Sequence, residues 1–585
     1  MSMWNCMQAA LCICLALAGC SSPPPANAPA VTELSSAAFR AVVDDYFKGF
    51  FEFNPSAGTA AGLHEYDTKL ENYSAESVRN RVGNLRSLLA RLDAIRNEKL
   101  SAEETMDAQL IDAQIRAELL DTETIQTWRR NPMIYIALPG GSIDGLMKRS
   151  FAPAPERLRS IILRLRGVEA LLGNLKDNVG EPPKEFTDLA LRMAKGSVGF
   201  FRDDLALWAK QAAGNDGNLF LDFQAANRRA VAGFEDITSY LEKTLLPQST
   251  GKYAIGSENF TNKLYYEELL DIPLNKVLQI GEANLEKDYK DFLATAKKID
   301  PGKSPAEVMK AMSSDHPGEE NLMQSAGNTL EGIRRFLVEK KIITIPSETR
   351  PVVMPTPPYA RSGTFASMDT PGAYEQKAKE AFYYVTPPEK DWTPQHKEEH
   401  LRLYNKPVMD IISIHEVFPG HFVQFLYARQ FPTKTRKLVS VGTNAEGWAH
   451  YSEQMMLEQG FGGGDPKIRL AQLSEALLRD CRYVAGIKLH TQGMSVEDGA
   501  KLFVQKGFQE PANAYEEARR GAYNPTYLYY TLGKLQIYKL REDYKKLKGN
   551  AFSLQQFHDE FVKQGSLPVK LIRQLLLPGD TGSTL

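Results

Sequence analysis

The chain has 585 residues, 43% of them hydrophobic, and 70 basic against 72 acidic side chains give a formal net charge of −2. No basic stripe emerges from this balance, so we expect no nucleic-acid partner, and the sequence indicates no protein partner. A chain of this length can stabilise itself by core burial alone. Four of the five cysteines lie within the first 20 residues, which leaves Cys481 as the one cysteine of the folded part.

The N-terminus predicts export and lipidation. An apolar run from Ala9 to Ala18 is followed by Gly19 and Cys20, a pattern typical of bacterial lipoprotein processing sites. We therefore predict a signal peptide over residues 1–19, a lipid on Cys20 and membrane attachment through that lipid. Ser21 replaces the Asp that retains such proteins at the inner membrane, which favours an outer-membrane anchor facing the periplasm. No Lys or Arg precedes the run, although export signals usually begin with basic residues.

Residues 20–34 are rich in Pro, Ala and Ser, and we expect them to form a flexible tether. Residues 35–585 lack a low-complexity linker and predict a single, mainly α-helical domain with two lobes and a central cleft. Helical spacing supports this expectation, since apolar residues recur every three or four positions. Examples are Val78, Val82, Leu85, Leu89, Leu92 and Ile95, and Leu158, Ile161, Ile162, Leu165, Val168 and Leu172.

The segment from Ile342 to Thr386 interrupts the helical pattern, because Pro and Gly alternate with short β-like runs. The runs Ile342–Ile345 and Phe382–Val385 predict a small β-sheet just before the histidine-rich segment. Its edge strand could pair with an extended peptide. A purely structural hairpin fits equally well, and the sequence leaves both open.

A metal site is predicted where His415-Glu416 and Pro419-Gly420-His421 follow one another. Imidazole and carboxylate are the ligands of hydrolytic zinc sites. In an unbroken helix, the six-residue spacing of the two histidines turns them apart by roughly 240°. Pro and Gly can form a wide turn or bulge that brings His421 back beside His415.

A second cluster lies on a helix predicted from Leu438 to Gln459. Glu446, His450 and Glu453 share one face of it, and Glu446 is our candidate for the third ligand of one zinc ion per chain. A solvated acidic face is the other interpretation. His450 could be a fourth ligand, a residue that orients Glu446, or a core histidine, and we favour the orienting contact over ligation.

These motifs also resemble a family. The stretches from His415 to Gln424, Glu446 to Glu453 and Pro525 to Gly533 are similar to those of the bacterial DUF885 family, as is Gly62 to Asp67. The resemblance implies a mostly helical, metallopeptidase-like fold. It also implies zinc held by His415, His421 and Glu446, and places this chain near the gluzincin-type peptidases.

For catalysis, Glu416 is the candidate general base, since a carboxylate beside a zinc ligand can accept a proton from activated water. Its alternative role is to orient a ligand. Tyr530 could donate a phenolic hydrogen bond to a developing oxyanion, although core packing is common for a tyrosine in such a run. Candidates to orient a metal ligand or to bind substrate are His450, Glu453, Arg482 and His490.

Two positions depart from the pattern that the family leads us to expect. Gly486 stands where we expect an Asp, and Met494 where we expect a Trp. If that Asp orients His490 or contacts substrate, activity here is altered or weakened.

Several functions therefore remain open. The sequence favours a periplasmic zinc metallopeptidase acting on peptides or peptide-like amides. A non-catalytic metal- or peptide-binding lipoprotein is one alternative. A metal-dependent esterase or amidase is another, because activated water attacks either kind of carbonyl.

Overall fold

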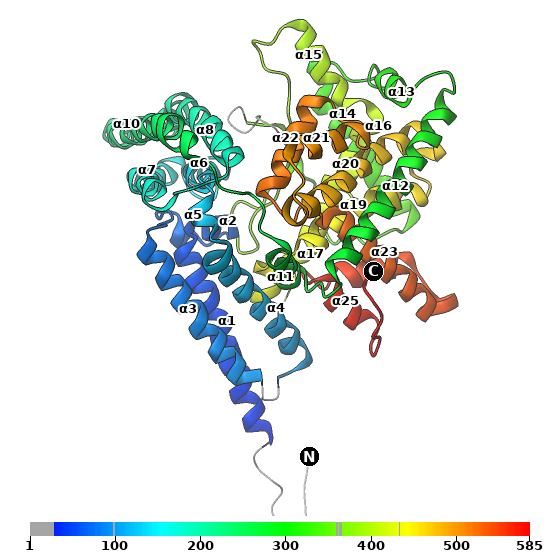
Figure 1. The fold of residues 1–585 in the computed structure, drawn as a ribbon, viewed down its shortest axis with the longest axis horizontal. Helices are drawn as coiled ribbons and strands as arrows, with labels where there is room; N and C mark the ends of the chain where they lie inside the picture. The colour runs from blue at the N-terminus through cyan, green and yellow to red at the C-terminus, as the bar shows by residue number, and fades with distance from the viewer. Residues whose placement is uncertain (1–27, 97–99, 358–360, 362–364, 432) are drawn as a thin grey trace, which may run out of the picture.

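The computed structural model describes residues 28–96, 100–357, 361, 365–431 and 433–585, and it is mainly helical (Figure 1). The first part of the chain forms α1 (Ala28–Phe53), α2 (Pro55–Ala61), α3 (Ala75–Arg96), α4 (Ala102–Leu119), α5 (Thr127–Arg130), α6 (Met133–Lys148), α7 (Ala154–Asn178), α8 (Lys184–Gly199), α9 (Leu205–Ala213) and α10 (Gly217–Tyr240). The later part forms α11 (Ser257–Glu268), α12 (Leu274–Ile299), α13 (Pro305–Met312), α14 (Leu322–Lys340), α15 (Pro394–Leu401), α16 (Lys406–Glu416), α17 (His421–Ala428), α18 (Lys434–Leu438), α19 (Gly442–Glu458), α20 (Pro466–Thr491), α21 (Val496–Gln505), α22 (Pro511–Tyr523), α23 (Tyr529–Lys548), α24 (Leu554–Val562) and α25 (Val569–Leu576).

The predicted apolar stripes are confirmed. In α7 every residue of the stripe from Leu158 to Leu172 is buried, and in α3 Leu85 and Leu92 are fully buried. This is the burial that a helix with one apolar face achieves when it packs against neighbours.

Helix α1 begins at Ala28, within the range 20–34 that we expect to form a flexible tether. Pro29 falls in the first turn of the helix, where a proline costs no backbone hydrogen bond. The signal peptide over residues 1–19 and Cys20 lie outside the described residues. None of the described helices is long and apolar enough to span a bilayer.

A three-stranded sheet, β1 (Val352–Pro355), β2 (Ala366–Asp369) and β3 (Phe382–Val385), has the order β1-β3-β2. β1 pairs with β3 in parallel, and β2 pairs with β3 antiparallel, with Ala366 opposite Val385. The predicted strand over Phe382–Val385 is confirmed.

The strand predicted at Ile342–Ile345 is wrong. Ile342 and Ile343 are buried directly after α14, whereas Thr344 donates its N–H and its hydroxyl to Asp559, at 2.8 and 2.6 Å. Those side-chain contacts replace strand pairing.

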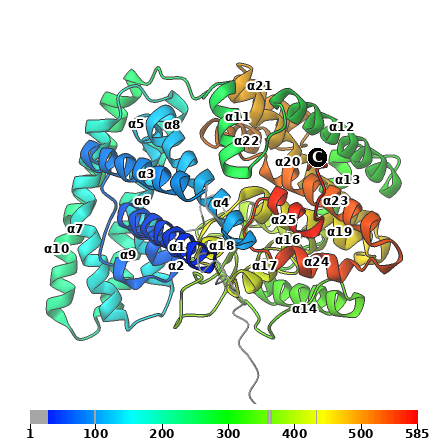
Figure 2. The ribbon, with the colours of Figure 1, turned by 90° about the horizontal axis from the view of Figure 1, so that it is seen from below.

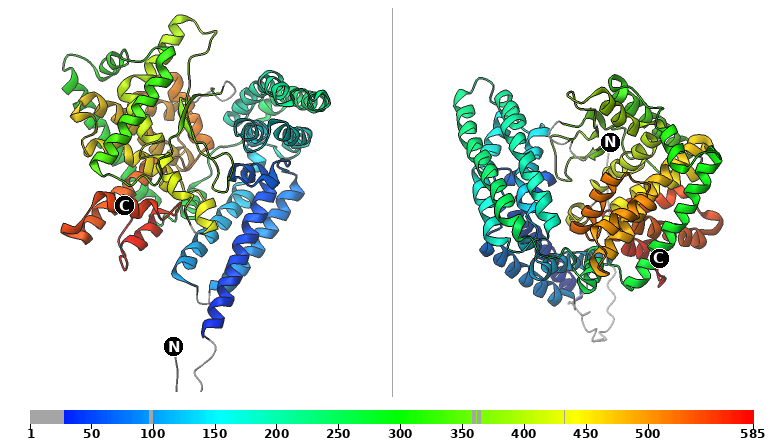
Figure 3. Two further views of the ribbon diagram at one scale, coloured as in Figure 1. Left: turned by 180° about the vertical axis from the view of Figure 1, so that it is seen from behind. Right: turned by 45° about the horizontal axis from the view of Figure 1, so that its top comes forward.

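The two halves of the molecule share their cores. Helices α1–α10 lie on one side and α12–α25 on the other, and views from below and at an angle keep the same division (Figures 2 and 3). One hydrophobic core joins residues 133–312 to residues 470–532, and the other joins residues 39–115 to residues 322–577. Between the halves, α11 packs against both α4 and α20.

Four elements position the histidine-rich segment. α16 packs against α19, α20 and β2, and α19 packs against α23. The last contact is close because Gly447 meets Gly533: a Cβ on Gly447 would lie 2.5 Å from the Gly533 Cα. Glycine at both positions therefore lets α19 and α23 approach backbone to backbone.

Candidate metal centre

The two histidines lie on different helices. α16 ends at Glu416, the Phe418–Pro419 peptide bond is cis, and His421 is the first residue of α17. Of the two predicted forms, a wide turn or a bulge, the structure has the turn, which separates two helices. At Gly420 a Cβ would lie 1.7 Å from the His415 carbonyl oxygen, so only glycine fits this turn.

The turn is also fixed from α19. The indole N–H of Trp448 donates to the Pro419 carbonyl oxygen at 2.9 Å, and Trp448 is fully buried. Helix α19 begins at Gly442 and not at Leu438, since α18 ends at Leu438 and a short extended stretch separates the two helices. The predicted start of this helix was therefore one turn too early.

His415, His421 and Glu446 come together in this arrangement. Each offers a ligand atom within 4.8 Å of the other two. The Glu446 Oε2 lies 3.5 Å from the His415 Nε2 and 3.4 Å from the His421 Nε2. Ligand atoms about 2.1 Å from a tetrahedral zinc ion would be about 3.4 Å apart, so these separations suit zinc.

The electrostatics of the cluster favour a cation. Burial lowers the pKa of His415, but its contacts with Glu446 and Glu453 outweigh burial and raise the pKa to about 9. Burial alone would raise the pKa of Glu446, yet His421 and His415 hold it well below its usual range. Carboxylates that attract protons to these imidazoles would attract a metal ion in the same way, with release of the protons.

Behind His415 lies a buried carboxylate. The Nδ1 of His415 is 2.7 Å from Oε1 of Glu453, and the Nδ1 of His450 is 3.2 Å from Oε2 of the same side chain. His450 therefore contacts Glu453, and our expectation of a contact with Glu446 was wrong. Burial and the nearby Lys534 lower the pKa of His450 to about 3, which keeps its imidazole neutral.

Sequence analysis missed Arg479. Its guanidinium lies 3.4 Å from Glu453 and also pairs with Glu475 at 2.8 Å. The pKa of Glu453 would rise through burial, but Arg479 and His450 lower it, so the buried carboxylate stays ionised. The spacing of Arg479 in the sequence could have indicated it, because Arg479 precedes the candidate Arg482 by three residues on one helix and so lies near the same face.

Glu416 lies beside the sheet. Its Oε2 accepts a hydrogen bond of 3.0 Å from the Met368 backbone N–H, a contact between α16 and β2 that no side-chain motif could reveal. The ring of Tyr530 stacks towards that of His415, with the centroids 6.4 Å apart and an angle of 25° between the planes. Burial and the negative charge of Glu446 raise the pKa of Tyr530, so its hydroxyl keeps its proton.

The remaining candidates lie farther out. Arg482 makes two 2.7 Å hydrogen bonds to Glu517, and its guanidinium lies 5.4 Å from the centroid of the Tyr530 ring. The Nε2 of His490 donates to the Gly521 carbonyl oxygen at 2.8 Å. Gly486 faces the ring of Tyr527, since a Cβ there would lie 3.2 Å from the ring Cε1.

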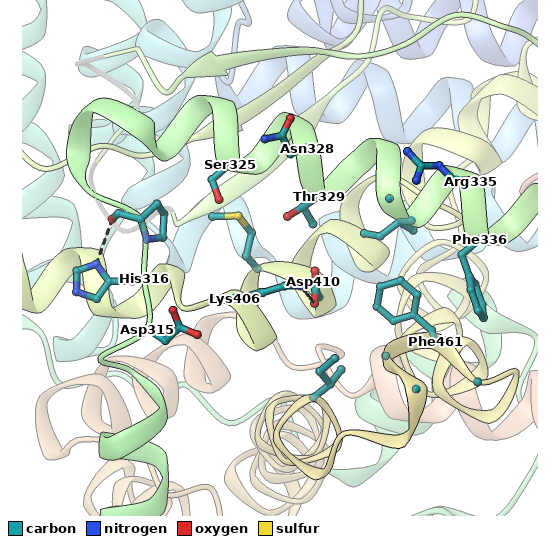
Figure 4. Close-up of a pocket in the computed structure, with 18 of the residues that line it drawn as sticks. Asp315, His316, Ser325, Asn328, Thr329, Arg335, Phe336, Lys406, Asp410 and Phe461 are labelled. Atoms are coloured by element: carbon teal, nitrogen blue, oxygen red, sulfur yellow. Dashed lines mark hydrogen bonds and ion pairs between the residues drawn. The ribbon is translucent and has the colours of Figure 1, made fainter.

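A cavity of about 780 Å³ lies on another part of α16 (Figure 4). Lys406 and Asp410 of the first turns of α16 form an ion pair of 3.1 Å there, and Asn328 and Thr329 of α14 also line it. None of the three candidate ligands lines this cavity. It is therefore separate from the metal centre.

Comparison with known proteins agrees with the motifs. A family model described as "Bacterial protein of unknown function (DUF885)" matches residues 55–576. The chain belongs to this family. The DUF885 description assigns no activity, and no curated protein matches the chain.

Two solved structures have the fold of this DUF885 protein. A proposed lipoprotein of unknown function from Shewanella oneidensis is 26% identical, with a TM-score of 0.77 over 93% of this chain and 99% of that one. A proposed lipoprotein from Colwellia psychrerythraea has a TM-score of 0.79 at 18% identity, over 93% of this chain and 98% of that one. The second likeness concerns the fold alone.

Proposed function

We propose that this DUF885 protein is a zinc-dependent peptidase, tethered by a lipid on Cys20 to the bacterial outer membrane on its periplasmic side. The observation that carries the proposal is the meeting of His415, His421 and Glu446 across three helices, with the ligand atoms within 4.8 Å of one another. Resemblance to the proposed lipoprotein from Shewanella oneidensis supports the anchor.

The donor set fits zinc. Two imidazoles and one carboxylate are a common catalytic zinc set, and they leave a coordination position for water or substrate. Zinc bound there would polarise a carbonyl and lower the pKa of water to about 7. Glu453 would orient His415 through Nδ1, so that Nε2 presents its lone pair to the metal.

Glu416 and Tyr530 would divide the proton chemistry. Glu416, next to His415, would accept a proton from the attacking water and pass it to the leaving amine. The Tyr530 hydroxyl, kept protonated by its raised pKa, would donate a hydrogen bond to the developing oxyanion. Arg482 would hold the Tyr530 ring from its far side.

The edge of the sheet supports an extended peptide as substrate. The carbonyl of Phe365, just before β2, accepts from Thr386 beside β3, so the alternate residues Ala366 and Met368 of β2 direct their backbone groups to the opposite edge. The Met368 N–H meets Glu416 there. A substrate strand that pairs with this edge would lie beside the proposed base.

The test is a Glu416→Gln variant beside Glu399→Gln, a matched change on exposed α15. Both proteins are loaded with zinc and assayed on a peptide library. We expect Glu416→Gln to keep its zinc and lose at least about 100-fold in kcat/KM, with Glu399→Gln unchanged. An unchanged rate in Glu416→Gln contradicts the base assignment. A zinc-loaded wild type that cleaves nothing would instead favour a binding lipoprotein.

A further inference from the structure

Two neighbouring cavities lie between the halves of the molecule, with volumes of about 450 and 380 Å³. They share part of their lining and so lie side by side. The shared residues are Asp121, Thr127, Lys263, Glu267 and Tyr529. The larger cavity is bounded by α1, α3 and α4 of the first half, by α11, and by the start of α19 and α23.

None of the three candidate ligands lines this space, but one helix connects it to the metal centre. Gly442, the first residue of α19, lines the larger cavity, and Glu446 follows one turn later, about 6 Å along the helix axis. The Tyr529 ring packs directly against Gly442, because a Cβ on Gly442 would lie 2.8 Å from the ring. Its neighbour Tyr530 faces His415. A substrate held at the metal could therefore extend a side chain or terminus into the cavity.

Carboxylates outnumber cations in the larger cavity. Its lining has one cation, Lys263, and four carboxylates, those of Glu118, Asp121, Glu267 and Glu268. Glu118 is paired with Arg81, which lies behind the lining, and Glu267 is paired with Lys263. Arg130 enters only the smaller cavity.

Asp121 lines both cavities and, unlike Glu267, has no cation within ion-pair distance among the described residues. It accepts a hydrogen bond of 2.5 Å from the Thr127 hydroxyl, and in the described part of the chain no ion pair reaches it. Burial lowers the pKa of Lys263, but attraction to Glu267, Asp121 and Glu268 outweighs burial and raises it. The surrounding carboxylates thus stabilise a buried ammonium group.

His490 adds a second and independent sign of a ligand. It lines the smaller cavity and is 1% exposed. Its Nε2 donates to Gly521, while its Nδ1 is buried without a hydrogen-bond partner among the described residues. Burial and the nearby Arg130 and Lys263 lower the pKa of His490 to about 4, so Nδ1 carries a free lone pair. A buried acceptor of this kind fits a ligand that donates N–H.

We propose that these two adjoining cavities form a specificity pocket for a positively charged group of the substrate, with Asp121 as its charge partner and His490 as a neutral acceptor. The group is an ammonium or guanidinium, from a basic side chain or a peptide N-terminus. The proposal rests on the peptidase function above and names the substrates it selects.

The test measures binding and cleavage of matched peptides. Zinc-loaded Glu416→Gln protein is titrated calorimetrically with alanine-based pentapeptides that carry one lysine or one norleucine, each with a free or an acetylated N-terminus. We expect the lysine or the free-amine peptide to bind about tenfold more tightly than its neutral match, equivalent to about 1.4 kcal/mol. Lysine preference assigns the pocket to a side chain, and free-amine preference assigns it to the N-terminus.

Asp121→Asn, combined with Glu416→Gln, should abolish this preference. The matched control is Glu123→Gln, which removes a carboxylate two residues away that pairs with Arg86 and lines neither cavity. Equal binding of charged and neutral peptides, or a preference that survives Asp121→Asn, overturns the pocket assignment.

Parallel assays with the wild-type enzyme keep the two proposals apart. Cleavage of charged and neutral peptides at equal kcat/KM would support the peptidase and overturn the pocket. Selective binding of the charged peptide without any cleavage would support the pocket and contradict the peptidase.

Discussion

The Nδ1 of His415 lies 2.7 Å from the Oε1 of Glu453, and both side chains are buried. A buried carboxylate that accepts from the second nitrogen of a ligand imidazole fixes its tautomer and its ring orientation. Because Glu453 also contacts His450 and Arg479, it links the candidate ligand to the packing between α19 and α20.

Replacing Glu453 with Gln should therefore weaken metal binding. We expect zinc affinity to fall by about 10- to 100-fold, as measured by competition with a chromogenic chelator, because His415 loses its charged partner. Glu458→Gln is the control, since Glu458 lies on the same helix but faces Tyr538 and Arg541. Equal zinc affinities of the two variants would show that Glu453 does not position His415.

The turn at Gly420 should tolerate no side chain. Gly420→Ala would place a Cβ 1.7 Å from the His415 carbonyl oxygen, so α16 and α17 must separate. We expect a drop of at least about 2 kcal/mol in the free energy of unfolding by urea, together with a loss of zinc binding. Gly173→Ala in α7 is the matched control, because its Cβ meets no atom within 4 Å and alanine favours the helix. A Gly420→Ala protein as stable as the control would contradict the described turn.

Glu268 should make stability depend on pH. Burial raises the pKa of its carboxyl from 4.5 to about 7, while hydrogen bonds from Thr443 and Gly442 oppose this rise. The folded state thus binds the proton more tightly than the unfolded state. The stabilisation is present below about pH 4.5 and is lost as the pH rises through 7.

Urea unfolding in chelator at pH 5 and at pH 7.5 checks this expectation. The wild type should lose more stability between these values than Glu268→Gln, whose amide does not titrate. Parallel changes in the two proteins would show that Glu268 titrates normally in the folded state.

The sequence predicted the helical class and the residues that form the cluster, because helical periodicity and ligand chemistry are both local. The apolar stripe of α7 is one example, and the pairing of Phe382–Val385 in the sheet is another. The resemblance of the motifs to DUF885 also predicted the family, and the match over residues 55–576 confirms it.

Other features depend on contacts between distant segments. Thr344 does not pair in a strand because it donates a hydrogen bond to Asp559, which lies 215 residues later in the chain. Likewise, the hydrogen bond from Met368 to Glu416 is donated by a backbone N–H, which the sequence does not distinguish. That His450 contacts Glu453 and not Glu446 depends on helix geometry. The extent of α1 towards Ala28 shows that alanine-rich composition alone cannot separate a tether from a helix.

The metal content of the purified protein tests the central claim most directly. Elemental mass spectrometry compares the wild type with His421→Ala and with a control, His396→Ala. His396 of α15 stacks on Trp392 and lies outside the cluster. We expect about one zinc per chain in the wild type and in His396→Ala, and its loss in His421→Ala. No zinc in the wild type after incubation with the metal, or zinc retained in His421→Ala, would contradict a metal centre built by His415, His421 and Glu446.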